Sequence, residues 1–474
     1  MPKVGLADRI FLTADSAETP QHVASLSTFT VPPGAGDEFV RELATTMRAQ
    51  TTFAAPFNYR LQSLLLKKIA PAWDVLSDDE IDIDYHFRHS ALPKPGGERE
   101  LGVLISRLHS APLDPLRPLW EFHLIEGLGP NEASGDRQEA SRFAIYIKIH
   151  HALMDGVGGA KRMDQMISPD PTSREFRPLW TIGPRARLDR ERPDRSLTDR
   201  ANALVTAGMA GAWTTAALGK VAGGMIVDTV LPRDPDAGIP FAVPSSVING
   251  RIGRQRRVAT QSYDLDRLTA VAKAADVKIN DVFLAISAGG LRRYLNELDE
   301  LPESSLVSGT PVSIRPPGND DAGNAFSMMI VRLGTDIADP LERIAAIARS
   351  STVGKDKLKA LPRGAVELSP ALFMAPFVAE NLVGLGGKVP PPYNVSISSI
   401  PGSTEPRYLA GAELEALYPV TMLYHGIALF IGAFTTAGKF GIGFTGDRDA
   451  LPHLQRLAVY TGDALEELEK ALGL

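Results

Sequence analysis

Hydrophobic and polar residues follow two different periods in the N-terminal third of the chain. The stretches HVASLSTFTV (22–31) and PLWEFHLIEG (118–127) have the length and apolar character of β-strands. DEFVRELATTMRAQ (37–50) and ERELGVLISRLHS (98–110) instead repeat their apolar residues at helical spacing. Strands and helices that alternate in this way predict a mixed α/β fold.

The same mixture returns toward the C-terminus. Residues 256–275 predict a strand followed by a helix, and residues 449–472 predict a final amphipathic helix. Between them, GIALFIGAFT (426–435) and GKFGIGFTG (438–446) predict strands. The sequence therefore predicts a second α/β region.

The two regions are separated by sequence of a different texture. From about Ser168 the chain is dense in Pro and Arg and lacks periodicity, which is typical of an exposed linker, and an Ala/Gly-rich segment with helical character follows. We expect an N-terminal domain over residues 1–185, a linker with the Ala/Gly-rich helical segment over 186–245, and a C-terminal domain over 246–474.

Composition narrows the class of protein. The 474 residues are 44% hydrophobic and 22% charged, as in a well-packed globular protein. A net charge of -6 argues against nucleic acid as a partner. The absence of cysteine excludes disulfides, thiolate metal sites and a cysteine acyl-enzyme, and fits a cytoplasmic protein.

No membrane span or secretory signal is predicted. The start, MPKVGLADRIFL, has no long apolar core, and nowhere do about 18–20 uncharged apolar residues run together. The nearest candidate, residues 201–231, carries Lys220 in its middle. We interpret it as a buried or surface-associated helical segment.

The candidate chemistry lies in RFAIYIKIHHALMDGVGGAKRM (142–163), where two histidines end an alternating apolar stretch. Successive strand residues point to opposite faces. A strand that continued through both histidines would place His151 on the side of Ile149 and His150 on the side of Lys148. One histidine can then reach a reacting group while the other serves the structure.

Asp155 follows near the start of a predicted helix. Its carboxylate could orient an imidazole or pair with an arginine, and Gly156 permits a turn that a bulkier residue resists. From the residues alone, a catalytic histidine and a hydrogen-bonded core histidine both stay open. A metal site has less support, since the other candidate ligands are scattered without ligand spacing: His86, His89, His109 and His123.

The pattern H-H-x-x-x-D-G after a strand resembles the signature of the CoA-dependent acyltransferase superfamily. Over nearly its whole length the chain resembles the bacterial wax ester synthase/diacylglycerol acyltransferase family. The matching stretches are ETPQHV (18–23), DIDYHFRHSALPKPGG (82–97), DPLRPLWEFHLIEGL (114–128), KIHHALMDGVGG (148–159), INDVFLA (279–285), PVSIRP (311–316) and YNVSISSIPG (393–402). The resemblance implies two chloramphenicol acetyltransferase-like α/β domains with mixed sheets, and an active-site channel where they meet.

The resemblance also implies an activity. Family members move a fatty acyl group from acyl-CoA, a co-substrate, to a long-chain alcohol or to diacylglycerol, without a permanently bound cofactor or a covalent intermediate. By analogy His151 is the general base, while His150 and Asp155 are structural, Asp155 through an arginine that the sequence does not identify. Such apolar substrates imply peripheral contact with a membrane or lipid inclusions.

Two other functions stay open at this point. One is a different acyltransferase of the superfamily, with a carrier-bound or polyketide acceptor. The other is a non-catalytic lipid-droplet protein that keeps the fold. The sequence also leaves open the oligomeric state and the balance between wax ester and triacylglycerol.

The remaining candidates have competing interpretations. Asn280 is either a helix N-cap or, by the resemblance, a contact to substrate or to a developing oxyanion. For the P-L-W motif, packing is favoured over a role as a wall of the substrate channel. Gly156 is a separate candidate for a substrate contact. The motif residues are Pro118, Leu119 and Trp120.

Asp15 and two short stretches also have competing interpretations. Asp15 stands where the family often has Glu, so its role in placing substrate is less secure. In SSIPGS (398–403), the residues Ser399 to Ser403 stand where the family commonly has N-V-P-G-P, and they are open to interpretation as a structural turn. The basic run RQRR (254–257) either meets CoA phosphates or forms a solvated surface patch.

Overall fold

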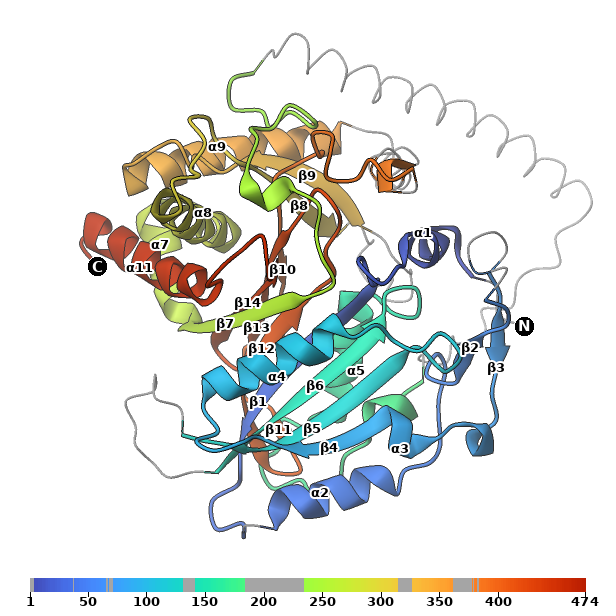
Figure 1. Ribbon diagram of the computed structural model, residues 1–474. Helices are drawn as coiled ribbons and strands as arrows, with labels where there is room; N and C mark the ends of the chain where they lie inside the picture. Colours follow the sequence, from blue (N-terminus) through green and yellow to red (C-terminus); the bar gives the residue numbers. More distant parts are fainter. Residues whose placement is uncertain are drawn as a thin grey trace, which may run out of the picture.

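Two six-stranded sheets form the centre of the protein in the computed structural model (Figure 1). The structure describes residues 4–36, 38–64, 67, 71–130, 141–183, 234–313, 326–360, 377, 379–381 and 383–474. The expected Ala/Gly-rich segment at 201–231 lies outside these residues. Within the described part, no helix is long and apolar enough to cross a membrane.

The first sheet contains most strands of the N-terminal half. In spatial order its strands are β11 (Tyr408–Leu409), β12 (Ala412–Val420), β1 (His22–Thr30), β6 (Arg142–His150), β5 (Trp120–Leu128) and β4 (Phe87–Ala91). Strands β4 and β5 are parallel, whereas β6 runs antiparallel to both of its neighbours. A small separate sheet pairs β2 (Tyr59–Leu61) with β3 (Trp73–Val75).

The second sheet belongs to the C-terminal half. Its order is β7 (Arg256–Asp264), β14 (Lys439–Asp447), β13 (Leu429–Thr436), β10 (Val395–Ile400), β8 (Val307–Ser313) and β9 (Phe326–Arg332). Strand β10 is parallel to both neighbours and the other pairs are antiparallel. These mixed sheets confirm the predicted fold class.

Helices accompany both sheets. In the N-terminal half they are α1 (Leu6–Ala14), α2 (Phe39–Arg48), α3 (Ile83–His86), α4 (Glu98–Ser110) and α5 (Gly156–Met166), with short 3-10 turns at Asp78–Glu80 and Leu179–Thr181. In the C-terminal half they are α7 (Leu265–Ala274), α8 (Ile279–Glu297), α9 (Pro340–Lys359) and α11 (Gln455–Leu472), with a 3-10 turn at Val247–Asn249.

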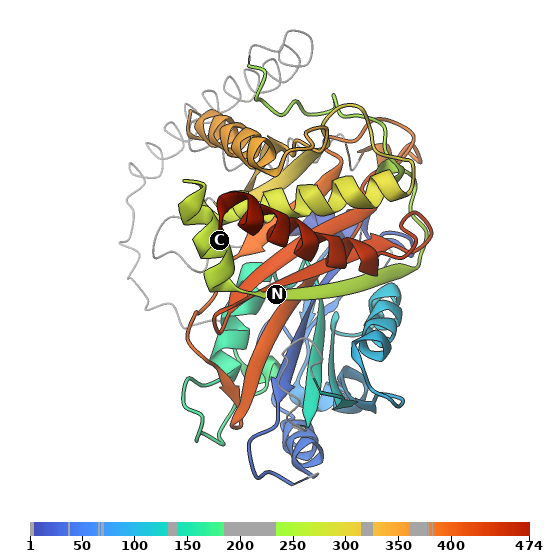
Figure 2. The ribbon, with the colours of Figure 1, turned by 90° about the vertical axis from the view of Figure 1, so that its left-hand side faces the viewer.

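Helices α8 and α11 lie side by side on one face of the second sheet (Figure 2). Two glycines of α8 make this contact close. A methyl group on Gly289 would lie 2.7 Å from the Ala464 Cβ, and one on Gly290 would lie 2.9 Å from the Thr461 Cγ2. Since real Cβ atoms do not approach so closely, a larger residue at either position would push the helices apart.

One strand crosses the predicted division at residue 246. Strand β12 belongs to the C-terminal part of the sequence, yet it pairs with β1 of the first sheet, with Leu26 opposite Tyr418. Its first five residues alternate between buried and more exposed, and either sheet could satisfy that local pattern. By joining the first sheet, β12 covers an edge of β1 that would otherwise present unpaired backbone groups.

Helix α4 makes a second connection between the halves. Strand β7 is an edge strand, and two serines of α4 accept hydrogen bonds from its backbone. Ser106 Oγ accepts from the Val258 N–H (2.9 Å), and Ser110 Oγ accepts from the Arg256 N–H (2.8 Å). The outer edge of the second sheet is therefore satisfied by side chains of the first half.

Candidate active site

His150 and His151 lie where strand β6 ends. All nine residues of β6 are buried, and its last pair with β1 joins His150 to His22. The strand ends at His150, but the His151 N–H still donates to the Gln21 carbonyl at 2.9 Å. The strand-alternation argument therefore holds only up to His150, and the turn sets the direction of the His151 ring.

The His150 ring is held from two sides. Its Nδ1 accepts a hydrogen bond from the Ala152 N–H (3.1 Å), so the neutral ring carries its proton on Nε2. Nε2 faces the Asp15 Oδ1 at 3.9 Å. Burial lowers the pKa of His150 to about 4; Asp15 raises it, and Lys67 and His151 lower it further. His150 is thus a buried, neutral residue at pH 7.

The His151 ring has a different environment. It packs against Phe11 of α1 with 4.0 Å between ring centroids, and it keeps partial exposure. Its Nδ1 has no hydrogen-bond partner among the described residues. Burial lowers the pKa of His151 to about 4, while the Asp155 carboxylate and the residue's own carbonyl raise it. The imidazole is therefore neutral at pH 7 and able to accept a proton.

Asp155 starts helix α5. As N-cap it accepts a hydrogen bond from the Gly158 N–H at 2.7 Å, and α5 begins at Gly156. A carboxylate at this position also suits the positive end of the helix dipole. The cap fixes the turn that carries His151 relative to α5. The predicted arginine partner of Asp155 stays a prediction.

Asn280 does not cap helix α8. The N-cap is Lys278, and the side chain of Asp281 accepts from its backbone N–H at 3.2 Å. The N-cap interpretation of Asn280 is therefore wrong. Instead the Asn280 Oδ1 accepts a hydrogen bond from Ser399 Oγ (3.1 Å) near the end of β10.

Strand β10 brings Asn280 toward the histidine turn. Ile400 directly follows Ser399, and its Cδ1 would lie 3.1 Å from a methyl group placed on Gly156. The start of α5 in one half and the start of α8 in the other thus meet around Ile400. Sequence reasoning included this stretch as a match to the family and as a partial departure from its motif, but did not predict its contact with Asn280.

The P-L-W motif is buried at the start of β5. Trp120 is buried, donates from its Nε1 to the Phe57 carbonyl (2.8 Å), and stacks on His86 at 4.3 Å. The Leu119 carbonyl accepts from the His150 N–H at 2.9 Å. The Pro118 carbonyl accepts from the Trp120 N–H at 2.9 Å. The motif thus supports the end of β6 through its backbone.

Leu119 also belongs to the apolar surroundings of His151. It shares a buried cluster with Phe11, Leu12 and Ala152. Sequence reasoning missed Phe11, although the apolar residues of LADRIFLTA (6–14) recur at i, i+4 spacing and predict a helix with one buried face.

In the basic run at 254–257, Arg254 and Gln255 are exposed, but Arg256 fits neither interpretation. Arg256 is only 3% exposed and lies 3.7 Å from the Asp447 carboxylate. It is therefore neither part of a solvated patch nor available to a CoA phosphate at the surface. Within the described residues no group of three or more His, Asp or Glu side chains is arranged to hold a metal ion.

Comparisons with known proteins agree along the whole chain. The sequence matches the wax ester synthase/diacylglycerol acyltransferase catalytic domain over residues 5–283 and the WS/DGAT C-terminal domain over residues 322–469. A putative diacylglycerol O-acyltransferase of Mycobacterium tuberculosis is 40% identical, covering 99% of this chain and 98% of its own. O-acyltransferase WSD of Acinetobacter baylyi is 35% identical, covering 98% and 96%.

Solved structures show the same relationship. The wax ester synthase/diacylglycerol acyltransferase from Marinobacter aquaeolei VT8 has a TM-score of 0.77 at 32% identity, over 100% of both chains. The first condensation domain of the calcium-dependent antibiotic synthetase has a TM-score of 0.57 at 16% identity, covering 100% and 97%, which shows the shared fold. The predicted family and two-domain acyltransferase fold are confirmed. The chain belongs to the wax ester synthase/diacylglycerol acyltransferase family and is an O-acyltransferase.

Proposed function

We propose that the protein moves a long-chain acyl group from acyl-CoA to a long-chain alcohol or to diacylglycerol, with His151 as general base. The related proteins named above act on these classes of acceptor by their names. The observation that carries the proposal is the state of His151. Its ring is neutral, has an unpartnered nitrogen, and lies against the apolar ring of Phe11.

The reaction needs one proton to move twice. An alcohol is a weak nucleophile until its proton leaves, so His151 takes that proton as the hydroxyl oxygen attacks the thioester carbonyl. The tetrahedral intermediate then collapses, the C–S bond breaks, and the imidazolium returns the proton to the CoA thiolate. The Asp155 carboxylate favours the transient imidazolium, because it raises the pKa of His151 against the effect of burial.

Asn280 supplies a donor for the oxyanion in this proposal. The hydrogen bond from Ser399 occupies its amide oxygen, which orients the amide nitrogen away from that contact. A preorganised N–H donor aimed at the developing negative charge lowers the barrier to acyl transfer. Because Asn280 comes from the C-terminal half, the proposed site is complete only when both halves are in contact.

The substrates imply where the protein works. Long-chain alcohols and diacylglycerols partition into lipid, so we propose peripheral contact with a membrane or with lipid inclusions. Acyl-CoA enters as a co-substrate and leaves as CoA. Limited access of water to His151 protects the thioester, since the same base would otherwise promote its hydrolysis.

The direct test is thiol release from palmitoyl-CoA with hexadecanol or diacylglycerol, with the lipid product identified by chromatography. The wild type should form wax ester, triacylglycerol or both, and His151→Ala should lose at least about a hundredfold in kcat. His453→Ala, at an exposed histidine, is the matched control. Unchanged turnover of His151→Ala would overturn the general base. A wild type inert with both acceptors would favour a carrier-bound acceptor or a lipid-binding role.

A further inference from the structure

The loop at residues 15–21 holds both histidines of the candidate site. Its Gln21 carbonyl accepts from the His151 N–H (2.9 Å), and its Asp15 carboxylate faces the His150 Nε2 (3.9 Å). The loop is also closed on itself, since the Asp15 Oδ1 accepts from the Gln21 N–H at 3.0 Å. A displacement of this loop would therefore be passed directly to the two rings.

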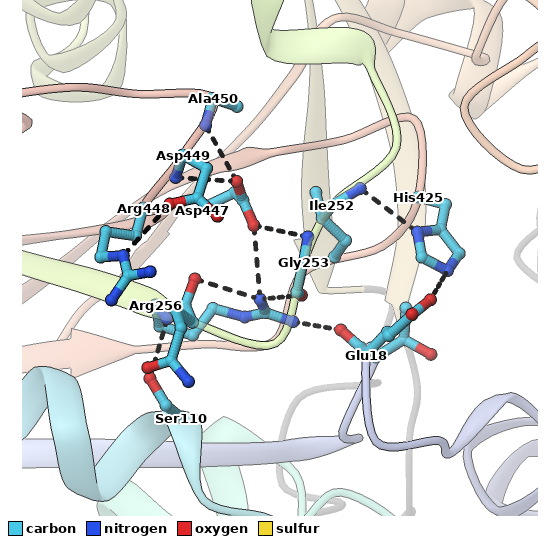
Figure 3. A network of polar contacts seen from close by, with 12 residues as sticks. Glu18, Ser110, Ile252, Gly253, Arg256, His425, Asp447, Arg448, Asp449 and Ala450 are labelled. Atoms are coloured by element: carbon cyan, nitrogen blue, oxygen red, sulfur yellow. Dashed lines mark hydrogen bonds and ion pairs between the residues drawn. The ribbon is translucent and has the colours of Figure 1, made fainter.

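The C-terminal half holds the other side of the same loop (Figure 3). Arg256, the first residue of β7, donates from Nη2 to the backbone carbonyl of Glu18. The Glu18 carboxylate, which is more exposed, lies 2.9 Å from the Arg251 Nη2 and 3.3 Å from the His425 Nε2. The buried contact goes to the backbone and the exposed contacts go to the side chain, so they can be removed separately.

Arg256 is itself held rigidly. Its Nη1 donates to the Gly253 carbonyl at 2.8 Å and lies 3.7 Å from the Asp447 Oδ2. Asp447 in turn accepts from the backbone N–H groups of Gly253 (2.8 Å) and Ala450 (2.9 Å). Burial lowers the pKa of Arg256 to about 10 and Asp447 raises it, so the guanidinium stays charged at neutral pH.

We infer that Arg256 is a positioning residue for acyl transfer, because it fixes the Glu18 carbonyl and with it the loop that holds His150 and His151. The inference rests on the proposed role of His151. A planar guanidinium can reach the Glu18 and Gly253 carbonyls at the same time, which links the second sheet to the histidine turn through one side chain. Contact between the two halves and the geometry of the base are then set by the same residue.

The test compares Arg256→Met with Arg343→Met. Arg343 is an equally buried arginine of the C-terminal half that pairs with Glu467 (3.2 Å) and lies among α8, α9 and α11. Both variants should lose stability. Per folded molecule, Arg256→Met should lose about 10- to 100-fold in kcat with little change in KM for palmitoyl-CoA, since a small misplacement of a catalytic group costs this much. Arg343→Met should keep the wild-type kcat.

A pH profile separates positioning from simple loss of structure. The acid limb of kcat reports the ionisation of the base. In Arg256→Met it should move to higher pH, because a loosened loop lets water reach the His151 ring and relieves its burial. Asp155, which faces His151, and Asp15 and Lys67, which face His150, are unchanged in both variants. The limb should not move in Arg343→Met.

Two further variants complete the design. Arg256→Lys keeps the charge but cannot reach both carbonyls, so it should recover only a small part of the lost kcat and carries the test if Arg256→Met does not fold. Glu18→Ala keeps the carbonyl and should lose less kcat than Arg256→Met. A wild-type kcat and acid limb in Arg256→Met, or in Arg256→Lys if only that variant folds, would overturn the inference. Failure of the proposed function shows separately, as wild-type turnover by His151→Ala in the same assay.

Discussion

Two groups of histidines lie along the first sheet, and they differ in what their ring nitrogens contact. The first group, His150 and His151, lies in the turn after β6. The second is a buried cluster between the sheet and α4, which we name the α4 cluster. It consists of His22, His109, Glu121, His123, Tyr146 and Lys148.

Hydrogen bonds are nearly complete in the α4 cluster. His109 uses both ring nitrogens, with Nε2 donating to the Thr421 carbonyl (2.9 Å) and Nδ1 accepting from the Tyr146 hydroxyl (2.9 Å). The ring of His22 contacts the His109 carbonyl at 2.9 Å. In the turn, by contrast, the His150 Nε2 and the His151 Nδ1 have no hydrogen-bond partner among the described residues.

Burial lowers the histidine pKa values in both groups, so a low pKa does not distinguish chemistry from structure. The pKa of His109 is lowered to about 3 and that of His151 to about 4, both chiefly by burial. What differs is whether a neutral nitrogen is left without a partner. This difference separates the turn from the α4 cluster; within the turn His150 is buried and only His151 keeps partial exposure, and this combination marks His151 as the candidate base.

Acid should destabilise both groups, and this is the largest effect we expect. The folded-state pKa values of His109, His150 and His151 are about 3, 4 and 4, below the unfolded value near 6.5. Stability is therefore complete above pH 6.5 and is lost as the pH falls toward these values. At pH 5 each of these histidines should lower the free energy of unfolding by about 2 kcal/mol relative to its value above pH 6.5. Urea unfolding at pH 7.5 and pH 5 measures it, and equal stability at both would contradict the assignment.

The second-largest effect on stability should come from breaking the Lys148–Glu121 ion pair of the α4 cluster. The Lys148 Nζ lies 2.9 Å from the Glu121 Oε2 and also donates to the Leu108 and Ala111 carbonyls, and Lys148 is fully buried. Lys148→Met should lower the free energy of unfolding by about 3–5 kcal/mol, because Glu121 is left charged and buried. Lys439→Met, at an exposed pair with Asp264, should cost less than about 1 kcal/mol. Similar losses in both would mean that the cluster adds no special stability.

The smallest effect we expect is at Asn280. Asn280→Ala should lower kcat by about 10- to 30-fold, or roughly 1.4–2 kcal/mol, with little change in melting temperature. Ser399→Ala removes only the contact that orients the amide and should cost about threefold or less. A full wild-type kcat in Asn280→Ala would contradict its proposed role as oxyanion donor. The proposed site would then rest on the histidine turn alone.

The sequence predicted the local elements well and their long-range pairing poorly. Helix α4 occupies the predicted residues 98–110, and β1 and β6 lie where strands were predicted. The pairing of β12 with β1 of the first sheet was not predicted, because the local pattern of a strand fits any sheet edge that offers backbone groups.

The candidate site was predicted in part. The histidine motif and Asp155 were found from their spacing, but the contacts of Arg256 with Glu18 and of Ser399 with Asn280 join residues more than 100 positions apart. No local pattern reveals such pairs. The charge of Lys148 inside an otherwise apolar strand was a usable signal, since a buried lysine needs a buried partner.

The most direct measurement compares the same substitution in the two groups of histidines. His151→Asn and His109→Asn would be assayed for kcat with palmitoyl-CoA and hexadecanol or diacylglycerol, normalised to the folded fraction. His151→Asn should lose at least about a hundredfold in kcat and keep its melting temperature, whereas His109→Asn should lose stability and keep kcat within about threefold. A wild-type kcat in His151→Asn, or an equal loss of kcat in both variants, would contradict the assignment of His151 as the base.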